Sequence, residues 1–305
     1  MSLLVVGSVA LDTVETPRER RERVLGGSAS FFSSVASLIT PVRLVAVVGD
    51  DFPREHLEFF STREIDLDGL QRVSGKTFHW SGRYLSNMVE RETLDTQLNV
   101  FAEFRPALPP RYADSRHVFL ANIDPGLQLD VLRQIKRPDL VAVDTMDFWL
   151  QGESLATLKQ VLQRADVVFL NDEEARMLSG HYSLVRAAAG IRRMGVERVI
   201  IKRGDAGAML FDEQGIFWAP AFPVEEVVDP TGAGDSFAGG FMAFLACGGA
   251  LGSDELRQAM IFGSAAGSFA VEAFSIDRFR TLTRDELLAR CQSFARLVEF
   301  KRVML

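Results

Sequence analysis

The segment VVDPTGAGDSFAGGF, residues 227–241, decides how the chain is interpreted because a glycine-containing turn leads directly into a helix. Pro230 biases Asp229 toward an extended conformation, so the chain should enter the turn from a strand-like segment. Residues 235–246 then carry apolar side chains at helical spacing. Glycine lets a backbone approach a ligand closely, and the N–H groups and dipole of a helix start attract anions. The segment therefore predicts an anion site.

Asp235 stands at or just inside the start of this helix. Its simplest role is an N-cap, which contributes about 0.5–2 kcal/mol, but a cap does not need bare backbone on both sides. A carboxylate within a cradle of N–H groups suits phosphoryl transfer to a hydroxyl group. Gly232, Ala233 and Gly234 would stabilise the transferred charge while Asp235 accepts the hydroxyl proton. The segment is no P-loop, and Phe237 takes the third glycine position of a dinucleotide fingerprint.

Short apolar runs alternate with helical patterns along most of the chain. The runs are continuous, so both faces of each strand should be covered, as in a parallel sheet. We therefore expect an α/β fold with a doubly wound, mostly parallel sheet flanked by helices. The expected strands cover residues 3–7, 42–49, 117–122, 140–146, 167–171 and 198–204. The expected helices cover residues 27–39, 53–64, 127–136, 153–164, 172–179 and 184–194.

Two segments interrupt this alternation. Residues 11–25 are polar and charged, and residues 75–105 alternate aromatic, polar and β-branched side chains, which is typical of antiparallel strands. We expect the two segments to form a small β-sheet that covers one edge of the core as a lid within a single domain, residues 1–305. The alternative is a pair of ordinary surface hairpins.

Composition excludes several classes of protein. The 305 residues carry a formal net charge of −7, which argues against nucleic acid as the main partner. No apolar run approaches the roughly 20 residues of a membrane span, and the N-terminal segment lacks the features of a signal peptide. Cys247 and Cys291 form no disulfide framework, and the four histidines show no metal-ligand spacing. The cytoplasm is the expected location.

The segment DPTGAGDSFAGGF resembles the C-terminal signature of the PfkB (ribokinase-like) family of carbohydrate and nucleoside kinases. Further resemblances follow in family order: GSVALD (7–12), GGSAS (26–30), VVGDDFP (47–53), NDEE (171–174), KRGDAG (202–207) and GSAAGSFAV (263–271). The resemblance spans nearly the whole chain. It implies a ribokinase-like fold and an ATP-dependent kinase that phosphorylates a hydroxyl group of a small sugar or polyol.

The resemblance also implies an acceptor site. Asp12, at the end of the first strand, should hold substrate hydroxyls, and the backbone at Gly26 and Gly27 should approach the acceptor. Phe31 stands where the family usually has an asparagine, which favours a more apolar or ring-bearing acceptor over ribose bound in the usual way. The alternative is that Phe31 belongs to the core. Asp144 ends another strand and is expected to face the acceptor too.

A nucleotide site is implied by the same comparison. Asn171 and Glu174 should lie near the triphosphate, with Glu174 organising Mg²⁺ through water, although the pair also suits an ordinary helix cap. Lys202 is expected to contact the phosphates. The remaining expected ATP contacts are Gly204, Gly207 and Ser264.

Further ligands and partners follow only from the resemblance. Asp229 and Thr231 match positions that hold K⁺ in many relatives, although residues 271–277 depart from the usual glycine-containing pattern. A homodimer through the lid would bury an exposed sheet edge. The alternatives to a sugar kinase are a nucleoside kinase of the same family and a non-catalytic nucleotide or sugar sensor. A nucleotide-binding oxidoreductase is disfavoured because an early G-x-G-x-x-G is missing.

Overall fold

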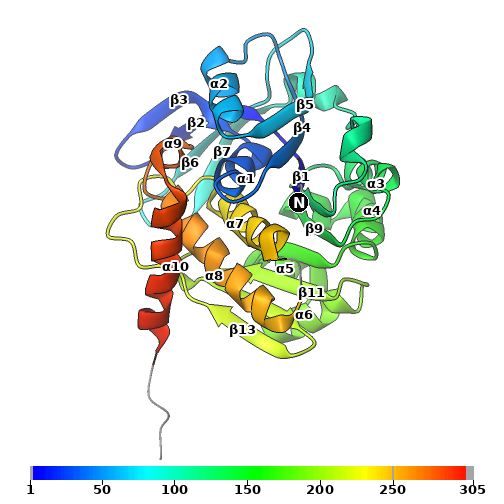
Figure 1. Cartoon of the computed structure of the whole chain (residues 1–305), viewed down its shortest axis with the longest axis vertical. Helices are drawn as coiled ribbons and strands as arrows, with labels where there is room; N and C mark the ends of the chain where they lie inside the picture. The colour runs from blue at the N-terminus through cyan, green and yellow to red at the C-terminus, as the bar shows by residue number, and fades with distance from the viewer. Residues whose placement is uncertain (1–2, 249–250, 300–305) are drawn as a thin grey trace, which may run out of the picture.

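The computed structural model describes residues 3–248 and 251–299. A nine-stranded, mostly parallel sheet forms its centre, in the order β13-β12-β11-β10-β9-β8-β1-β4-β5 (Figure 1). The strands are β1 (Leu3–Val6), β4 (Val42–Val48), β5 (Ile65–Arg72), β8 (His117–Leu120), β9 (Leu140–Asp144), β10 (Val167–Asn171), β11 (Arg198–Lys202), β12 (Ala208–Asp212) and β13 (Gly215–Ala219). All six strands expected for this sheet are present, so the predicted doubly wound fold is confirmed.

Strands at the two edges of the sheet were not expected. β5 lies at one edge, and the antiparallel pair β12–β13 lies at the other. An edge strand has neighbours on one side only and tolerates polar residues. The sequences of β5 (IDLDGLQR) and β13 (GIFWA) are accordingly exposed at several positions. They lack the continuous apolar runs that reveal the central strands.

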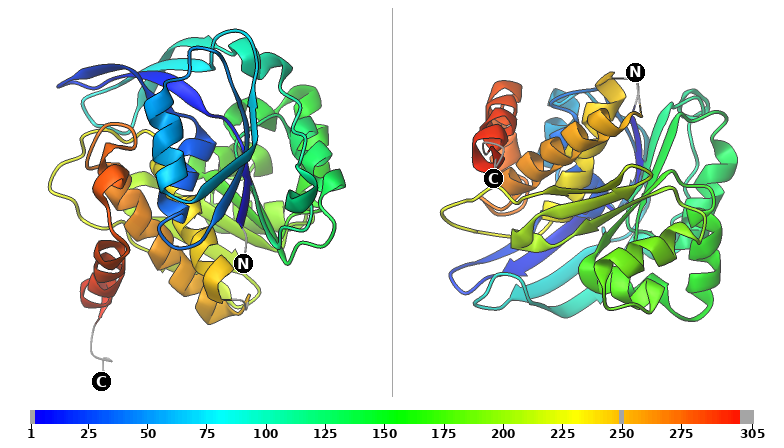
Figure 2. Two further views of the ribbon diagram at one scale, coloured as in Figure 1. Left: turned by 45° about the horizontal axis from the view of Figure 1, so that its top comes forward. Right: turned by 90° about the horizontal axis from the view of Figure 1, so that it is seen from below.

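Helices cover both faces of the sheet (Figure 2). Alternate residues of β1 separate two cores: Leu3 and Val5 pack in the cluster that includes α1, α7 and α8, while Leu4 and Val6 pack in the cluster that includes α3 to α6. The helices are α1 (Ser28–Ala36), α2 (Arg54–Thr62), α3 (Pro125–Gln134), α4 (Gly152–Leu162), α5 (Asp172–Ser179), α6 (Leu184–Arg192), α7 (Ala233–Gly248), α8 (Ser253–Ala270), α9 (Asp277–Thr281) and α10 (Arg284–Val298). No helix within the described ranges is long and apolar enough to cross a membrane.

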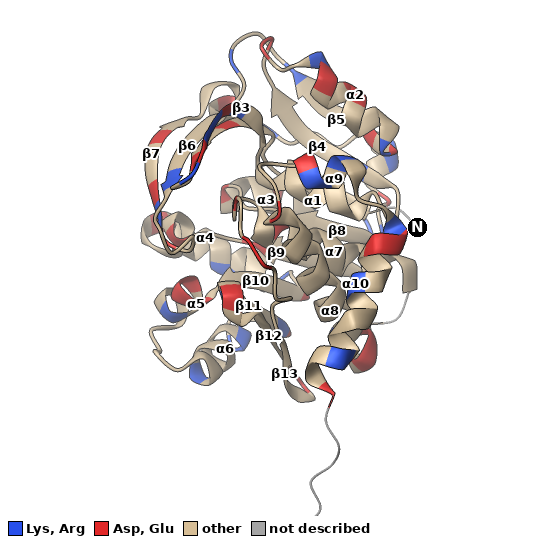
Figure 3. Ribbon diagram, turned by 90° about the vertical axis from the view of Figure 1, so that its left-hand side faces the viewer, with Lys and Arg blue, Asp and Glu red and all other residues tan. Residues whose placement is uncertain are grey.

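A second, four-stranded sheet has the order β3-β2-β6-β7 and is called the small sheet below. Its strands are β2 (Ala10–Glu15), β3 (Arg20–Gly26), β6 (His79–Tyr84) and β7 (Arg91–Gln97). The two segments that were expected to form it do so, and the parallel pairing of β2 with β6 joins them. Figure 3 shows the small sheet standing beside β9, β10 and β11 of the central sheet.

Phe169 on β10 provides a test of the core. Its side chain is 0% exposed and makes edge contacts with the rings of Phe119 and Phe241, at centroid distances of 5.9 and 5.4 Å. Phe169→Ala should lower the free energy of unfolding by about 3–5 kcal/mol, because it leaves a cavity between rigid elements. Urea unfolding measures this loss. Tyr182→Ala, at a side chain that is 86% exposed, should change stability by less than about 0.5 kcal/mol. Equal losses of stability in the two variants would contradict the assignment of Phe169 to the core.

Candidate active site

The turn before α7 depends on Gly232. Its φ of 74° is one that other residues rarely adopt, and a Cβ there would lie 2.2 Å from Cγ of the Phe31 ring. The ring of Phe31, which is 2% exposed, therefore supports the turn from behind and belongs to the core. The N–H of Thr231 donates to Oδ1 of Asp229 at 2.9 Å and fixes the entry to the turn.

The N–H groups of this turn are only partly free. Neither Gly232 nor Gly234 donates its N–H to another group in the part of the chain that the structure describes. The N–H of Ala233 donates to the carbonyl of Pro230 at 3.3 Å, so its expected role in anion binding is shared with a hydrogen bond inside the turn. The start of α7 at Ala233 directs the helix dipole at the same point. The arrangement suits an anion.

Asp235 lies in the first turn of α7, as expected. Burial raises the pKa of Asp235 to about 7; the charge of Asp144 raises it further, and the charges of Lys202 and Arg91 oppose the rise. A carboxyl group with a pKa near neutral accepts a proton far better than an ordinary aspartate does. A carboxyl group with a pKa near neutral therefore lies in the first turn of α7, close to the glycine-containing turn.

Lys202 brings a positive charge to this turn. Its Nζ lies 2.8 Å from Oδ2 of Asp144, and a Cβ on Gly234 would lie 3.2 Å from the same Nζ. Burial tends to lower the pKa of Lys202, but Asp144 and Glu174 raise it overall, so the ammonium stays charged. Oδ1 of Asp144 accepts the N–H of Thr145 at 2.9 Å. Asp144, expected to face the acceptor, is thus engaged in holding Lys202.

Asn171 and Glu174 form a reciprocal capping box at the start of α5. The N–H of Glu174 donates to Asn171 Oδ1 at 2.7 Å, and the N–H of Asn171 donates to Glu174 Oε2 at 2.8 Å. The capping alternative noted from the sequence is therefore confirmed. Burial raises the pKa of Glu174 to about 7, and the charge of Lys202 opposes this rise. Glu174 is a cap that also faces the charges of the site.

The other expected nucleotide residues lie on two elements. Gly204 and Gly207 have positive φ values of 54° and 87° in the turn between β11 and β12. A Cβ on Gly207 would lie 2.2 Å from the carbonyl oxygen of Ala219, so the turn requires glycine there. Ser264 is buried on α8, the helix that packs on α7.

The sequence had suggested that Asp12 lies at the end of the first strand, but Asp12 does not belong to β1. β1 ends at Val6, and Asp12 lies within β2 of the small sheet. Residues 7–9 separate the two strands, and a Cβ on Gly7 would lie 2.7 Å from the Cβ of Ala121. The apolar run therefore breaks into two strands of different sheets. This correction moves Asp12 onto the sheet that we expected to act as the lid.

The carboxylate of Asp12 is buried and incompletely satisfied. It is 4% exposed, and its Oδ1 has no hydrogen-bond partner among the described residues. A Cβ on Gly26 would lie 1.8 Å from Oδ2 of Asp12, so only glycine allows this approach. Burial raises the pKa of Asp12 to about 7, with the N–H groups of Trp80 and Gly27 opposing the rise. A buried acceptor without a donor suits a ligand hydroxyl.

Two residues near the site were not expected from the sequence. Asn122 follows β8, where its Oδ1 accepts the indole N–H of Trp149 at 2.9 Å. A polar residue directly after a buried strand was the available signal, because strand ends meet at one edge of the sheet. Arg91 begins β7, and its charge acts on Asp235. Nothing in the local sequence distinguishes Arg91 from the other arginines of the small sheet.

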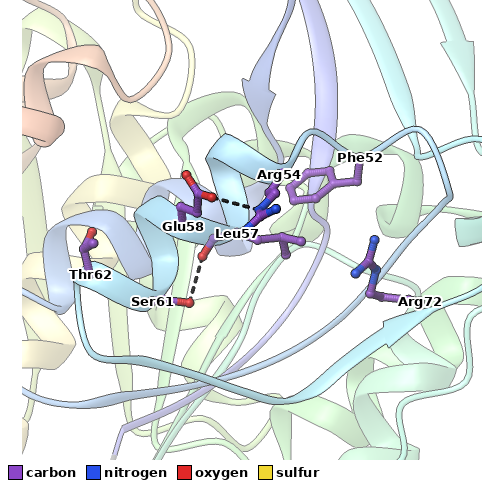
Figure 4. Close-up of a pocket in the computed structure, with 7 residues that line it drawn as sticks. All are labelled: Phe52, Arg54, Leu57, Glu58, Ser61, Thr62 and Arg72. Carbon is purple, nitrogen blue, oxygen red and sulfur yellow. Dashed lines mark hydrogen bonds and ion pairs between the residues drawn. The ribbon is translucent and has the colours of Figure 1, made fainter.

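A surface pocket of about 430 Å³ lies elsewhere, beside α2 (Figure 4). Arg54 and Glu58 form an ion pair of 2.9 Å at its rim, between side chains that are 89% and 62% exposed. Its lining residues are Phe52, Arg54, Leu57, Glu58, Ser61, Thr62 and Arg72. None of them belongs to the candidate active site, and the exposed ion pair is a weak, solvated interaction.

Comparison with known proteins agrees with this geometry. Residues 2–278 match the sequence profile described as "pfkB family carbohydrate kinase". The chain belongs to this family. The predicted class of enzyme, a phosphotransferase that acts on hydroxyl groups, is thereby confirmed, as is the resemblance noted from the sequence.

Individual relatives of this PfkB-family chain differ in substrate. A cytidine kinase from Thermococcus kodakarensis is 33% identical, over 80% of this chain and 88% of that protein. A candidate Ribokinase II from E. coli, in complex with ATP and Mg²⁺, is 21% identical with a TM-score of 0.79 and covers 96% of this chain and 99% of that one. A fructokinase double mutant from Vibrio cholerae, bound to fructose, ADP and potassium, is 17% identical with a TM-score of 0.75, covering 95% and 98%. The two structures share the fold.

Asp12→Asn should stabilise the protein at alkaline pH. Because the pKa of Asp12 is raised from 3.8 to about 7 by burial, the folded protein pays for an ionised carboxylate above pH 7. Removing that charge should raise the free energy of unfolding by up to about 4 kcal/mol at pH 8. The gain should shrink as the pH falls toward 4, where both states become protonated. Thermal melts between pH 4 and 8 measure it.

The control for this stabilisation is Asp95→Asn, at an exposed aspartate of the same small sheet. It should show no gain that grows with pH. A melting temperature of Asp12→Asn below that of the wild type at pH 8 would show that the Asp12 carboxylate is satisfied within the protein.

Proposed function

We propose that the chain is an ATP-dependent kinase that phosphorylates a sugar hydroxyl of a nucleoside. The observation that carries this proposal is the juxtaposition of Asp235, the Gly232–Gly234 turn and Lys202 at the start of α7. It combines a base, free N–H groups and a fixed positive charge, which are the requirements of phosphoryl transfer to a hydroxyl. This combination supports phosphoryl transfer as the reaction of the site.

Two observations favour a nucleoside over a free sugar or polyol. The relative with 33% identity that covers most of the chain is a cytidine kinase. In addition, side chains alternate along a strand, so Trp80 and Tyr84 share one face of β6. The hydroxyl of Tyr84 bonds to Thr231, so this face points to the turn. Trp80 therefore offers an aromatic surface on which a nucleobase can stack.

The proposed transfer uses two carboxylates, two backbone N–H groups and one ammonium group of this chain. Asp12 accepts hydrogen bonds from acceptor hydroxyls through its unpartnered oxygen. The oxygen of the acceptor hydroxyl bonds to the γ-phosphorus, and Asp235 accepts the proton of that hydroxyl. The bond between the γ-phosphorus and the β–γ bridging oxygen breaks, which releases ADP. The N–H groups of Gly232 and Gly234 and the ammonium of Lys202 stabilise the charge on the moving phosphoryl group.

Mg²⁺ suits the carboxylates beside the nucleotide region. Glu174 lies within electrostatic reach of Asp144 and Asp147, while Lys202 is the cation that opposes them. Mg²⁺ binds through phosphates, water and few carboxylates, so Glu174 would hold it through water. Bound there, the ion would neutralise phosphate charge. No group of three or more potential metal-ligating side chains occurs among residues 3–248 and 251–299, which leaves most of the coordination to ATP and water.

A monovalent cation suits Asp229. The side chain is 0% exposed, and its oxygens accept the N–H groups of Thr231 and Ser275 at 2.9 and 3.1 Å. Burial nevertheless raises its pKa, and no Lys, Arg or His pairs with it in the described part of the chain. A K⁺ ion held by Asp229 and Thr231 would neutralise this charge and steady the turn.

K⁺ should therefore raise the melting temperature of the wild-type protein, because a ligand that binds only the folded state stabilises it. Asp229→Asn should abolish this response, since the neutral amide no longer needs a counter-ion. Differential scanning calorimetry in KCl and in choline chloride at equal ionic strength measures the effect. Equal melting temperatures of the wild type in both salts would contradict a bound K⁺ ion.

Asp235→Asn should lower kcat by about 10²–10⁴-fold, because the amide cannot accept a proton. The affinity for Mg²⁺-ATP should remain close to that of the wild type. In the wild type, kcat/KM should decrease as the pH falls below about 7, which is the pKa that burial gives Asp235. The reason is that the protonated form is inactive. Coupled measurement of ADP release gives both results.

The matched control is Asp254→Asn, at an aspartate in the first turn of α8 whose side chain is 84% exposed. It should retain wild-type turnover. Turnover of Asp235→Asn near that of the control would exclude Asp235 as the base.

The acceptor is identified by ADP release with Mg²⁺-ATP and a panel of cytidine, uridine, adenosine, inosine, ribose and fructose. The proposal predicts turnover with at least one nucleoside at lower KM than with either free sugar. Preference for a free sugar would favour the sugar kinase expected from the sequence. ATP binding without turnover across nucleosides and sugars would favour a sensor.

A further inference from the structure

A hydrogen bond joins the small sheet to the anion-binding turn. Tyr84, at the end of β6, is 5% exposed, and its hydroxyl lies 3.2 Å from Oγ1 of Thr231. This bond links two residues that are 147 positions apart in the sequence. Thr231 directly precedes Gly232 of the turn. It ties the position of the small sheet to the turn.

Arg91 lies beside this bond. It is the cross-strand partner of Tyr84 in the β6–β7 pair, and directly opposed residues of an antiparallel pair share a face. The Arg91 guanidinium carbon lies 5.6 Å from the centre of the Trp80 ring, on the same face. Burial raises the pKa of Tyr84, and the bond to Thr231 and the charge of Arg91 oppose that rise. The guanidinium is therefore close to the Tyr84 hydroxyl and the turn.

Arg91 differs from the other arginines in the strands of the small sheet. Each of the others forms an ion pair: Arg20 with Glu22, Arg21 with Glu19, Arg23 with Asp51 and Arg83 with Glu15. Arg91 pairs with no carboxylate of the described chain, although its charge reaches Asp235. Figure 3 shows the mixed charges of these strands. An unpaired arginine facing an anion site is available to a ligand.

We propose that Arg91 is a catalytic residue that contacts the phosphoryl group during transfer, and that Tyr84 is the positioning residue that holds it at the turn. This inference rests on the proposed kinase function. The planar guanidinium donates a fork of hydrogen bonds that matches phosphoryl oxygens. It adds a second positive charge to that of Lys202 while the acceptor oxygen bonds to phosphorus, the bond to ADP breaks and Asp235 receives the proton.

The role of Arg91 couples acceptor binding to catalysis. Asp12 and Trp80 belong to the same sheet as Arg91, so an acceptor bound between them and the turn favours the arrangement in which the guanidinium reaches the phosphoryl group.

Steady-state kinetics with the best nucleoside test the proposal. Arg91→Gln should lower kcat by about 10²-fold, as removal of one donor to a developing oxyanion does, with a smaller change in the KM for the acceptor. Arg91→Lys should restore part of this loss because it keeps the charge. Tyr84→Phe should lower kcat by about three- to tenfold, which is the equivalent of one neutral hydrogen bond. Arg83→Gln is the matched control and should retain wild-type kcat. Arg83 is next to Tyr84 on β6, but it forms an ion pair with Glu15 of β2.

A binding measurement separates this proposal from the kinase function itself. Calorimetric titration with Mg²⁺-ADP and fluoroaluminate, a mimic of the transferred phosphoryl group, needs no acceptor. Arg91→Gln should weaken this binding about tenfold or more while Mg²⁺-ADP alone binds as to the wild type. Equal binding of the mimic to wild type and Arg91→Gln, or a kcat equal to that of Arg83→Gln, would overturn the proposal. A wild type without acceptor-dependent turnover would refute the kinase function, and the titration would still decide the role of Arg91.

Discussion

The conformation of Gly232 is the constraint on which the site depends. Its positive φ turns the chain from Asp229 into α7, and the Phe31 ring fills the space where a side chain would stand. This turn sets where the dipole of α7 points, where Asp235 emerges, and how closely Lys202 can approach Gly234. The anion binding, proton acceptance and charge neutralisation that we propose therefore all depend on a single backbone turn and the aromatic ring behind it.

Charge in the site is arranged around this turn at a cost to stability. Burial raises the pKa values of Asp12, Glu174 and Asp235 to about 7, so ionised carboxylates there are unfavourable in the absence of ligands. The positive charge of Lys202, which pairs with Asp144, offsets part of the negative charge of Glu174 and Asp235. The folded protein thus holds groups that are better satisfied by a hydroxyl, a phosphate or a cation than by one another, which is typical of functional sites.

The sequence predicts the central strands and their helices well because buried parallel strands are continuous apolar runs. Edge strands escape prediction, since exposed or partly exposed positions interrupt their apolar runs. The Asp235 turn is predictable because glycine, proline and aspartate each have a local reason to be there. Asp12 and Arg91 are different: Asp12 was assigned to the wrong strand, and Arg91 was overlooked. Their positions depend on pairing in the small sheet, which joins distant segments and leaves no local pattern.

The parallel pairing of β2 with β6 also has a consequence for how the protein folds. Thr13 pairs with Ser81, and the intervening chain includes α1, β4, α2 and β5, which all belong to the central layers. Closing such a long loop costs conformational entropy, which makes the pairing of β2 with β6 slow to form. The small sheet should therefore form late, after β1, β4 and β5 have come together. A folding intermediate with an intact central sheet would lack Asp12 and Arg91 at the site, so ligand binding would appear only in the last step of folding.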